Sequence, residues 1–147
     1  LDLTQEFKEL FEFFDALTTE HHVQLVLNGK APTVQGDRAL LRRAFSNLLS
    51  NAIRYTPHGG IIRVHLSADD GAHAIVSIAN PGEDIPIEHL PKLFDRFYRA
   101  DPSRQRQSEG TGLGLAITKA IVESHDGAIS AHSGNGTTYF VITLPSR

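Results

Sequence analysis

The segment from Asp37 to Tyr55 constrains the fold of this chain most, because it has the pattern of a long helix with two different faces. Asp37 is suited to cap its start, and Thr56-Pro57-His58-Gly59-Gly60 ends it sharply. The apolar residues recur in pairs at helical spacing: Leu40/Leu41, Ala44/Phe45, Leu48/Leu49 and Ala52/Ile53. One side of this helix must therefore be covered by other elements of the chain.

Apolar periodicity predicts two further helices and several short strands around this segment. A helix over residues 4–20 begins at Thr4 as its cap, and a helix over 112–126 ends at Gly127. Residues expected on the buried faces of these two helices are Phe7, Leu10, Phe11, Phe14 and Leu17, and Leu113, Ile117, Ala120 and Ile121. Alternating apolar residues predict strands at 23–27, 33–36, 62–66, 74–78, 128–133 and 138–144. Short connections such as Asp70-Gly71 favour a mostly antiparallel or mixed sheet, so the expected fold is an α+β two-layer sandwich with the sheet packed against three helices.

The composition excludes several classes of protein. The 147 residues contain no cysteine, which excludes disulfides, thiol nucleophiles and thiolate zinc sites. Lys and Arg number 14 against 17 Asp and Glu, a net charge of -3 that does not suggest nucleic-acid binding. No apolar run approaches the roughly 20 residues of a membrane span, and no signal-peptide pattern is present. These two absences predict a soluble chain. Because the first residue is Leu1 rather than Met, we expect a fragment of a longer protein, and we expect this fragment to be monomeric.

A polar stripe on the long helix is the first candidate site. Asn47, Asn51 and Arg54 lie at positions i, i+4 and i+7, opposite the leucine face. An Asn amide oxygen can ligate Mg²⁺, and an arginine beside it can contact phosphate oxygens. A solvated helix surface has the same pattern, so the stripe alone leaves both interpretations open.

Three further segments suit an anionic or planar ligand. Gly110-Thr111-Gly112-Leu113-Gly114 leads into a helix, where backbone N–H groups can approach an anion. The long polar loop before it contains Arg99, Arg104 and Arg106, side chains suited to polyphosphate. Asn80-Pro81-Gly82 follows an apolar strand, where the Asn side chain can contact one edge of a flat ring. A flexible hinge, a solvated loop and an ordinary turn are the alternative interpretations.

The eight histidines are scattered along the chain without the spacing of metal ligands. We therefore interpret them as structural or surface residues.

The candidate sites together resemble, in order and in spacing, the motifs of sensor histidine kinases. The segment 47–57 resembles their N-box, 80–86 their first glycine box, 94–99 their F-box and 110–115 their second glycine box. The resemblance covers nearly the whole chain. It implies the Bergerat ATP-binding fold, with one catalytic ATP-binding domain over residues 1–147 and an ATP lid at about residues 87–112.

The resemblance also implies which residues bind Mg²⁺ and ATP. Asn51 matches the Mg²⁺ ligand, and Arg99 and Arg104 match lid positions near the phosphates. Asn51, Arg54, Arg99 and Arg104 are the implied catalytic residues. The implied nucleotide contacts are Asn47, Asn51, Arg54, Tyr55, Asn80, Gly82, Ile85, Arg99, Arg104, Gly110, Thr111, Gly112, Leu113, Gly114 and Thr138.

Three positions depart from the family pattern. Asn80 stands where the family usually has the Asp that accepts a hydrogen bond from the adenine amino group, and Asp84 replaces a glycine of the same motif. An Asn carbonyl can still accept that bond, though more weakly than a carboxylate. The Asn-Pro-Gly form resembles the heavy-metal-sensing subgroup. In the last motif Thr137 stands in place of the glycine before Thr138, which leaves the backbone conformation there open.

Asn47 occupies the position at which related ATPases (gyrase, the heat-shock chaperones, mismatch-repair proteins) carry a glutamate base. An amide cannot accept a proton at neutral pH, so phosphoryl transfer is favoured over hydrolysis. The resemblance implies transfer of the γ-phosphoryl group of ATP to a histidine on a separate dimerisation helix, a context that none of the eight histidines has. A response regulator would act downstream, and the parent would be a homodimeric bacterial inner-membrane sensor with this domain in the cytoplasm. The alternatives are a self-sufficient ATPase of the same fold and a catalytically silent nucleotide-binding module.

Overall fold

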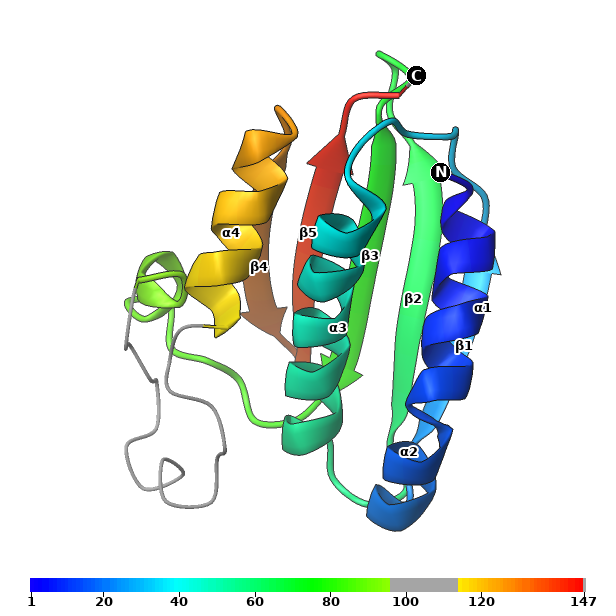
Figure 1. The fold of residues 1–147 in the computed structure, drawn as a ribbon. Helices are drawn as coiled ribbons and strands as arrows, with labels where there is room; N and C mark the ends of the chain where they lie inside the picture. The colour runs from blue at the N-terminus through cyan, green and yellow to red at the C-terminus, as the bar shows by residue number, and fades with distance from the viewer. Residues whose placement is uncertain (96–113, 147) are drawn as a thin grey trace.

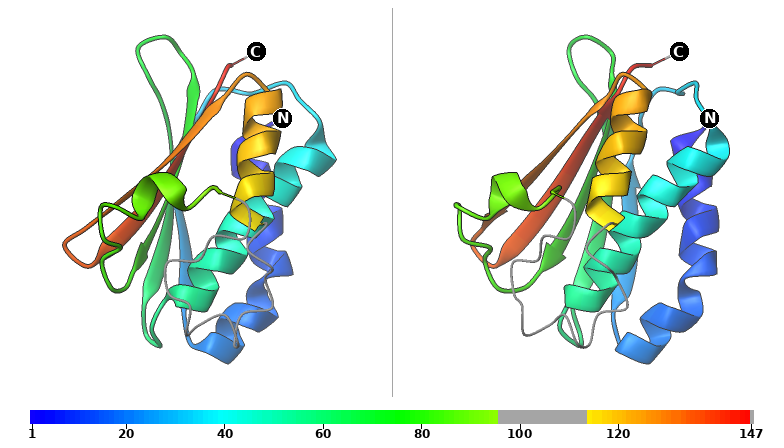
Figure 2. Two further views of the ribbon diagram at one scale, coloured as in Figure 1. Left: turned by 90° about the vertical axis from the view of Figure 1, so that its left-hand side faces the viewer. Right: turned by 60° about the vertical axis from the view of Figure 1, so that its left-hand side comes forward.

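The structure, a computed structural model, describes residues 1–95 and 114–146, which form a layer of helices on one face of a mixed sheet (Figures 1 and 2). The helices are α1 (Leu3–Phe13), α2 (Asp15–His21), α3 (Arg38–Tyr55) and α4 (Gly114–Ser124), with a short 3₁₀ helix η1 (Leu90–Lys92). The strands are β1 (Gln24–Gly29), β2 (Ile61–Ala68), β3 (Ala74–Pro81), β4 (Ala128–Gly134) and β5 (Thr137–Leu144). Their order in the sheet is β1-β2-β3-β5-β4, with β1 and β2 parallel and the other neighbours antiparallel. The expected α+β sandwich is confirmed.

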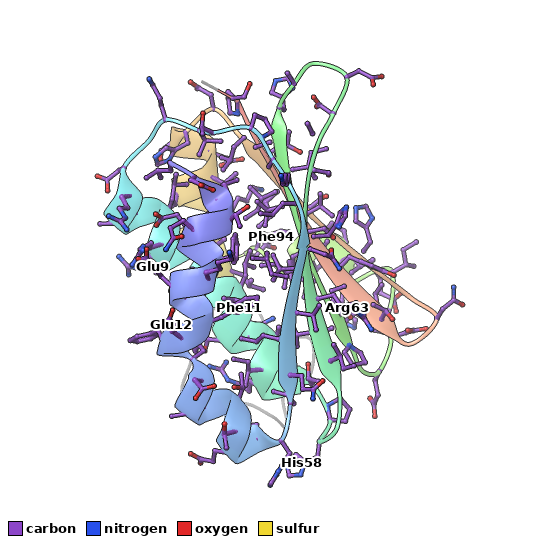
Figure 3. All side chains as sticks on the ribbon, turned by 90° about the vertical axis from the view of Figure 1, so that its right-hand side faces the viewer. Glu9, Phe11, Glu12, His58, Arg63 and Phe94 are labelled. Carbon is purple, nitrogen blue, oxygen red and sulfur yellow. The ribbon has the colours of Figure 1, made fainter. Side chains whose placement is uncertain are left out.

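The core lies between the sheet and the helices, as strand alternation predicted. In β2, Ile62, Val64 and Leu66 are buried while Arg63 and His65 are exposed. Figure 3 shows side chains from the helices and the sheet filling the space between the two layers. Cross-strand registers align the buried residues into rows, such as Val64, Ile78 and Phe140 on β2, β3 and β5. This packed surface fixes where the ends of β3 and β5 lie.

The single helix expected over residues 4–20 is wrong, because the chain forms two helices that meet at Phe14. Phe14 has φ −90° and ψ 2°, which interrupts helical geometry, and its side chain is buried while that of Phe13 is exposed. The cap is Asp2 rather than Thr4, since the Gln5 N–H donates to Asp2 Oδ1 at 3.3 Å. The predicted apolar face is otherwise correct: Phe7, Leu10 and Phe14 are buried, and Phe11 and Leu17 are partly buried against the core.

The strand expected at residues 33–36 is also wrong. Val34 is buried, but its backbone pairs with Leu1, which donates to Val34 O and accepts from Val34 N–H. β1 pairs instead with β2, in parallel, after the chain has crossed over through α3. The local turn signal Asn28-Gly29 therefore ends β1 without forming a hairpin.

The helix expected at 112–126 corresponds to α4, of which the described part begins at Gly114. Its buried residues are Thr118, Ile121 and Val122, whereas Ala120, expected on the buried face, is exposed. Gly127 follows the helix as predicted, although the left-handed residue is Asp126, with φ 60°. Gly127 is required by close packing, because a Cβ there would lie 2.4 Å from Thr143 O on β5.

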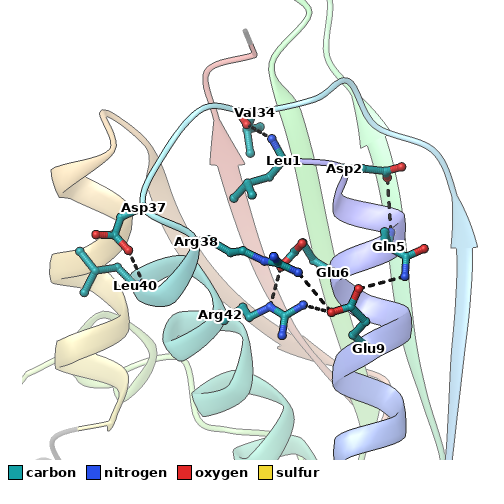
Figure 4. A network of polar contacts seen from close by, with 10 residues as sticks. All are labelled: Leu1, Asp2, Gln5, Glu6, Glu9, Val34, Asp37, Arg38, Leu40 and Arg42. Carbon is teal, nitrogen blue, oxygen red and sulfur yellow. Dashed lines mark hydrogen bonds and ion pairs between the residues drawn. The ribbon is translucent and has the colours of Figure 1, made fainter.

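An ion-pair cluster fastens α1 to the first turns of α3 (Figure 4). The buried carboxylate of Glu6 accepts from Arg38 Nε at 3.2 Å and from Arg42 Nε at 2.6 Å, and Glu9 pairs with the same two arginines. Hydrogen bonds from Gln5 and Arg42 lower the pKa of Glu9, and hydrogen bonds to Glu6 and Glu9 raise the pKa of Arg42. Sequence reasoning did not predict this cluster. It orients α1 on the helix that carries Asn47 and Asn51.

Candidate functional site

Asn47 connects α3 to the first turn of α4. Its amide nitrogen donates to Gly114 O at 3.3 Å and to Thr118 Oγ1 at 3.4 Å. Thr118 is completely buried and donates to the same Gly114 carbonyl at 2.8 Å. A second bond lies at the other end of α4, where the N–H of Asp37, the cap residue of α3, donates to Nε2 of His125, which follows α4, at 3.0 Å. The start of α4 is therefore held against the polar stripe of α3.

The rest of the polar stripe lies further along α3, as predicted. Asn51 is half-buried, and its amide forms no hydrogen bond with any residue of the described segments. Arg54 is exposed and Tyr55 is half-buried, and both have interaction partners. The three side chains follow Asn47 toward the carboxyl end of the helix, where Thr56 Oγ1 donates to Ala52 O at 2.6 Å.

Asn80 and Thr138 lie side by side at the end of two neighbouring strands. They are paired in the register of β3 and β5, and both are buried. The Asn80 amide nitrogen donates to Pro81 O at 3.2 Å, while its Oδ1 accepts no hydrogen bond from the described residues. A carbonyl oxygen in this position can accept a hydrogen bond from an exocyclic amino group. The structure thus brings together two predicted site residues that are far apart in the sequence.

Hydrogen bonds hold the loop after β3 against the turn between β4 and β5. Gly136 N–H donates to Asp84 Oδ1 at 2.8 Å, and Gly82 N–H donates to Gly136 O at 2.9 Å. Ile85 N–H donates to Ser133 Oγ at 2.7 Å. Asp84, which departs from the family pattern, therefore stabilises the loop. Neither Asp84 nor Ser133 was identified as functional from the sequence, because each acts through a residue distant along the chain.

Gly82 follows the end of β3 and has a backbone conformation that favours glycine. Its φ is 157°, which residues with a side chain rarely adopt, whereas a Cβ there would make only an ordinary contact, 3.4 Å from Tyr55 O. Thr137, which replaces a glycine of the family pattern, pairs with Pro81 and Gly134 in the sheet and does not have a positive φ. The sheet accepts a threonine there because the positive φ belongs to Gly136, at 77°.

Several predicted site residues lie outside the described segments. These are Arg99, Arg104, Gly110, Thr111, Gly112 and Leu113. Phe94, at the start of the expected F-box, packs edge-on against Phe140 with ring centroids 6.0 Å apart, and Lys119 Nζ lies 6.0 Å from the Phe94 centroid. These contacts place Phe94 beside α4 and β5.

The donor atoms of this region suit a hard cation rather than a transition metal. Asn51 supplies an amide oxygen, a ligand type that Mg²⁺ prefers together with water and phosphate oxygens. No group of three or more His, Cys, Asp or Glu residues in the segments 1–95 and 114–146 is arranged to hold a metal ion. A site for Mg²⁺ completed by the phosphates of a nucleotide is compatible with this chemistry.

The chain is similar to histidine kinases in sequence and in structure. The family described as Histidine kinase-, DNA gyrase B-, and HSP90-like ATPase matches residues 36–147. Sensor histidine kinase CusS of Escherichia coli O157:H7 is 50% identical over 147 residues, 100% of this chain and 30% of that protein. The probable sensor kinase SilS of Salmonella typhimurium is 51% identical over 121 residues, 82% of this chain and 24% of that protein. The mycobacterial sensor histidine kinase MprB has a TM-score of 0.87 at 31% identity, covering 100% of this chain and 97% of that structure.

The fold and the matched motifs define an ATP-binding domain. The chain belongs to the family of histidine kinase-, DNA gyrase B- and HSP90-like ATPases, and within it to the catalytic domains of sensor histidine kinases. The similarity to CusS and SilS confirms the heavy-metal subgroup that the Asn-Pro-Gly loop predicted. The chain spans about 30% of the length of CusS. None of the helices described in residues 1–95 and 114–146 is long and apolar enough to cross a bilayer.

Proposed function

We propose that this domain binds Mg²⁺ and ATP beside α3 and delivers the γ-phosphoryl group to a histidine on a separate dimerisation domain of the same sensor. The observation that carries the proposal is that the side chain of Asn51 is available to a ligand. Its amide is half-buried and bonds to no described residue, although the preceding asparagine on the same stripe is bonded to α4. Such an amide oxygen is suited to ligate Mg²⁺.

Each remaining residue has a role in this proposal. Asn80 Oδ1 accepts from the adenine amino group, with Thr138 beside it, and Gly82 and Ile85 form the backbone of the loop that borders the base. Arg54 and Tyr55 contact the nucleotide further along α3. The bound Mg²⁺ would neutralise charge on the phosphates and orient them. Lid residues that complete the phosphate site are Arg99, Arg104, Gly110, Thr111, Gly112, Leu113 and Gly114.

Transfer forms a bond between the γ-phosphorus and an imidazole nitrogen of the acceptor. It breaks the bond between that phosphorus and the β,γ-bridging oxygen, so ADP leaves with the bonding electrons. The protein contributes chiefly positioning and electrostatic stabilisation, as in phosphoryl transfer generally. Asn47 supports transfer over hydrolysis, because its amide donates to α4 and cannot take a proton from water. This argues against a self-sufficient ATPase.

The wider setting of the domain follows from the sensor kinase class. We infer that the parent protein is a homodimeric, membrane-anchored sensor of bacteria that carries this domain on the cytoplasmic side of the inner membrane. Its partners are its own dimerisation domain and a response regulator rather than nucleic acid. We expect this domain to be monomeric by itself, since dimerisation in this proposal belongs to a separate domain.

The role of Asn51 is tested by measuring ATP affinity calorimetrically with Mg²⁺ and with EDTA. We expect Asn51→Ala to weaken binding roughly tenfold or more in Mg²⁺, the scale of losing a metal-site interaction, and to leave binding in EDTA unchanged. Asn80→Ala should weaken binding in both buffers, because it contacts the base. Asn28→Ala, the same change on the exposed edge strand β1, is the control and should change neither.

Three results would contradict the proposal. Equal weakening of Asn51→Ala in both buffers would show that Asn51 contacts nucleotide and not the metal. For the reaction, labelled phosphate should move from ATP to a histidine of the CusS dimerisation domain added to this chain, and the transfer should fail in Asn51→Ala. Steady release of phosphate to water without transfer would favour the ATPase, and ATP binding without either reaction would favour the silent module.

A further inference from the structure

Two histidines that are far apart in the sequence meet at one end of the domain. His22 follows α2, and His58 lies in the loop between α3 and β2. Their ring centroids are 5.2 Å apart and the ring planes are inclined by 58°. Figure 3 shows His58 at the end of the molecule where α2 finishes. Both side chains are exposed.

Backbone hydrogen bonds hold the two loops of this pair together. Gly59 N–H donates to His22 O at 2.7 Å, and Gln24 N–H donates to Gly60 O at 3.1 Å. These bonds continue the parallel pairing of β1 and β2, which begins with Gln24 opposite Ile61. The positions of the two histidine Cα atoms are therefore fixed before any ligand binds, so that only side-chain rotation remains to be restricted.

The ring nitrogens of this pair are available to a ligand. Neither His22 nor His58 forms a side-chain hydrogen bond with a residue in the part of the chain that the structure describes. Most of the other histidines are engaged. Ring nitrogens of four of them bond to neighbouring residues: His65, His73, His125 and His132.

The spacing of the rings suits a shared metal ion. A metal lies about 2.0–2.1 Å from an imidazole nitrogen, so two imidazoles on one tetrahedral ion have ring centroids roughly 5 Å apart. We propose that His22 and His58 bind one divalent transition metal ion, of the Zn²⁺ or Cu²⁺ type, with water in the remaining positions. Imidazole suits these ions and does not suit Mg²⁺, so the site is separate in chemistry from the proposed nucleotide site.

Binding at this site has a measurable consequence for the folded chain. The ion joins the turn after α2 to the loop after α3, and the two histidines are 36 positions apart in a chain that must be folded to bring them together. An ion that binds the folded state in preference to the unfolded state raises the melting temperature. Protons compete with the metal for imidazole nitrogen, so binding should weaken in acid.

The test is calorimetric titration of the chain with Zn²⁺ alone, without nucleotide, together with melting curves. We expect one ion per chain and a raised Tm. Two variants remove one histidine each: His22→Asn, chosen because asparagine tolerates the left-handed backbone at φ 56°, and His58→Ala. Loss of a residue that only supports a metal ligand typically weakens metal binding roughly 10- to 100-fold, so loss of a ligand itself should weaken Zn²⁺ binding at least as much. Each variant should also remove the rise in Tm.

Two control variants separate this pair from other histidines. His132→Ala changes an exposed histidine on β4, and His73→Ala removes the pair of His73 with Asp69. Both should bind Zn²⁺ as the unchanged chain does. Unchanged binding in His22→Asn and His58→Ala, or binding lost in His73→Ala instead, would overturn the proposal.

A measurement on the unchanged chain avoids any folding defect of a variant. Substoichiometric Cu²⁺ is paramagnetic and broadens the NMR signals of the rings that it contacts. The ring protons of His22 and His58 should broaden before those of the other histidines. Equal broadening of all eight, or none at this pair, would refute the site.

Discussion

Replacing Phe7 by alanine should destabilise the entire domain, although Phe7 lies outside residues 36–147, where the family match is found. The Phe7 side chain is fully buried, and its ring centroid lies 4.8 Å from that of Phe45 on α3. A buried Phe→Ala change costs about 3–5 kcal/mol, of which the aromatic pair accounts for about 0.5–1.5 kcal/mol. A domain of this size has about 5–15 kcal/mol of stability in total. The variant should therefore melt about 6–20 °C lower.

The assay is urea unfolding followed both by circular dichroism and by tyrosine fluorescence, since the chain has no tryptophan. Phe13→Ala is the matched control, because Phe13 lies on the same helix with 77% of its surface exposed. Its cost should stay under about 1 kcal/mol. Equal costs for the two variants, or a separate early transition for α1, would refute the view that residues 1–35 belong to one cooperative unit with the site.

Two further predictions concern single carboxylates. Asp84→Ala should weaken ATP binding several-fold in calorimetry, because the loop after β3 loses its hydrogen bond from Gly136 N–H. Glu83→Ala changes the exposed neighbouring residue and should leave ATP affinity unchanged. Equal ATP affinities of the two variants would contradict the role of Asp84. The pKa of Asp69 lies below its usual value because the backbone N–H of His73 donates to its carboxylate at 2.8 Å. The ionised carboxylate therefore stabilises the folded chain at pH values above the ordinary aspartate pKa of about 3.9, and this stabilisation is lost as the pH falls through the lower pKa of the folded state. Asp69→Asn should lower Tm at neutral pH and not in strong acid; a loss of Tm that is the same at every pH would be inconsistent with this linkage.

The sequence predicted most of the sheet and the α3 part of the site because both depend on local periodicity. Asn47, Asn51 and Arg54 needed only the 3.6-residue repeat to be placed on one stripe. The motif order then indicated that Asn80 and Thr138 belong to one site, and the β3·β5 register pairs them. Predictions from such local patterns are correct here because tertiary packing does not override the local conformation that the sequence favours.

The errors arose where distant residues decide local structure. The segment around Val34 has a sequence that predicts a short strand, but the backbone hydrogen bonds of Val34 go to Leu1, 33 positions away. The first helix breaks at Phe14, and the periodicity of the segment, which correctly placed the Phe14 ring on the buried face, gives no sign of this interruption. Likewise, Asp84 gains its role only because folding brings Gly136 within 2.8 Å.

The pairing of Asn80 with Thr138 bears on how nucleotide reaches and leaves the proposed site. Both residues lie in β3 and β5, which are hydrogen-bonded along their length in the interior of the sheet. Interior strands of this kind separate only when most of the domain unfolds, whereas loops and the ends of helices open at a lower cost in free energy. We therefore expect the base end of the proposed site to stay rigid and ADP release to depend on the opposite side, where Asn47 supplies the side-chain hydrogen bonds that join the first turn of α4 to α3 among the described residues.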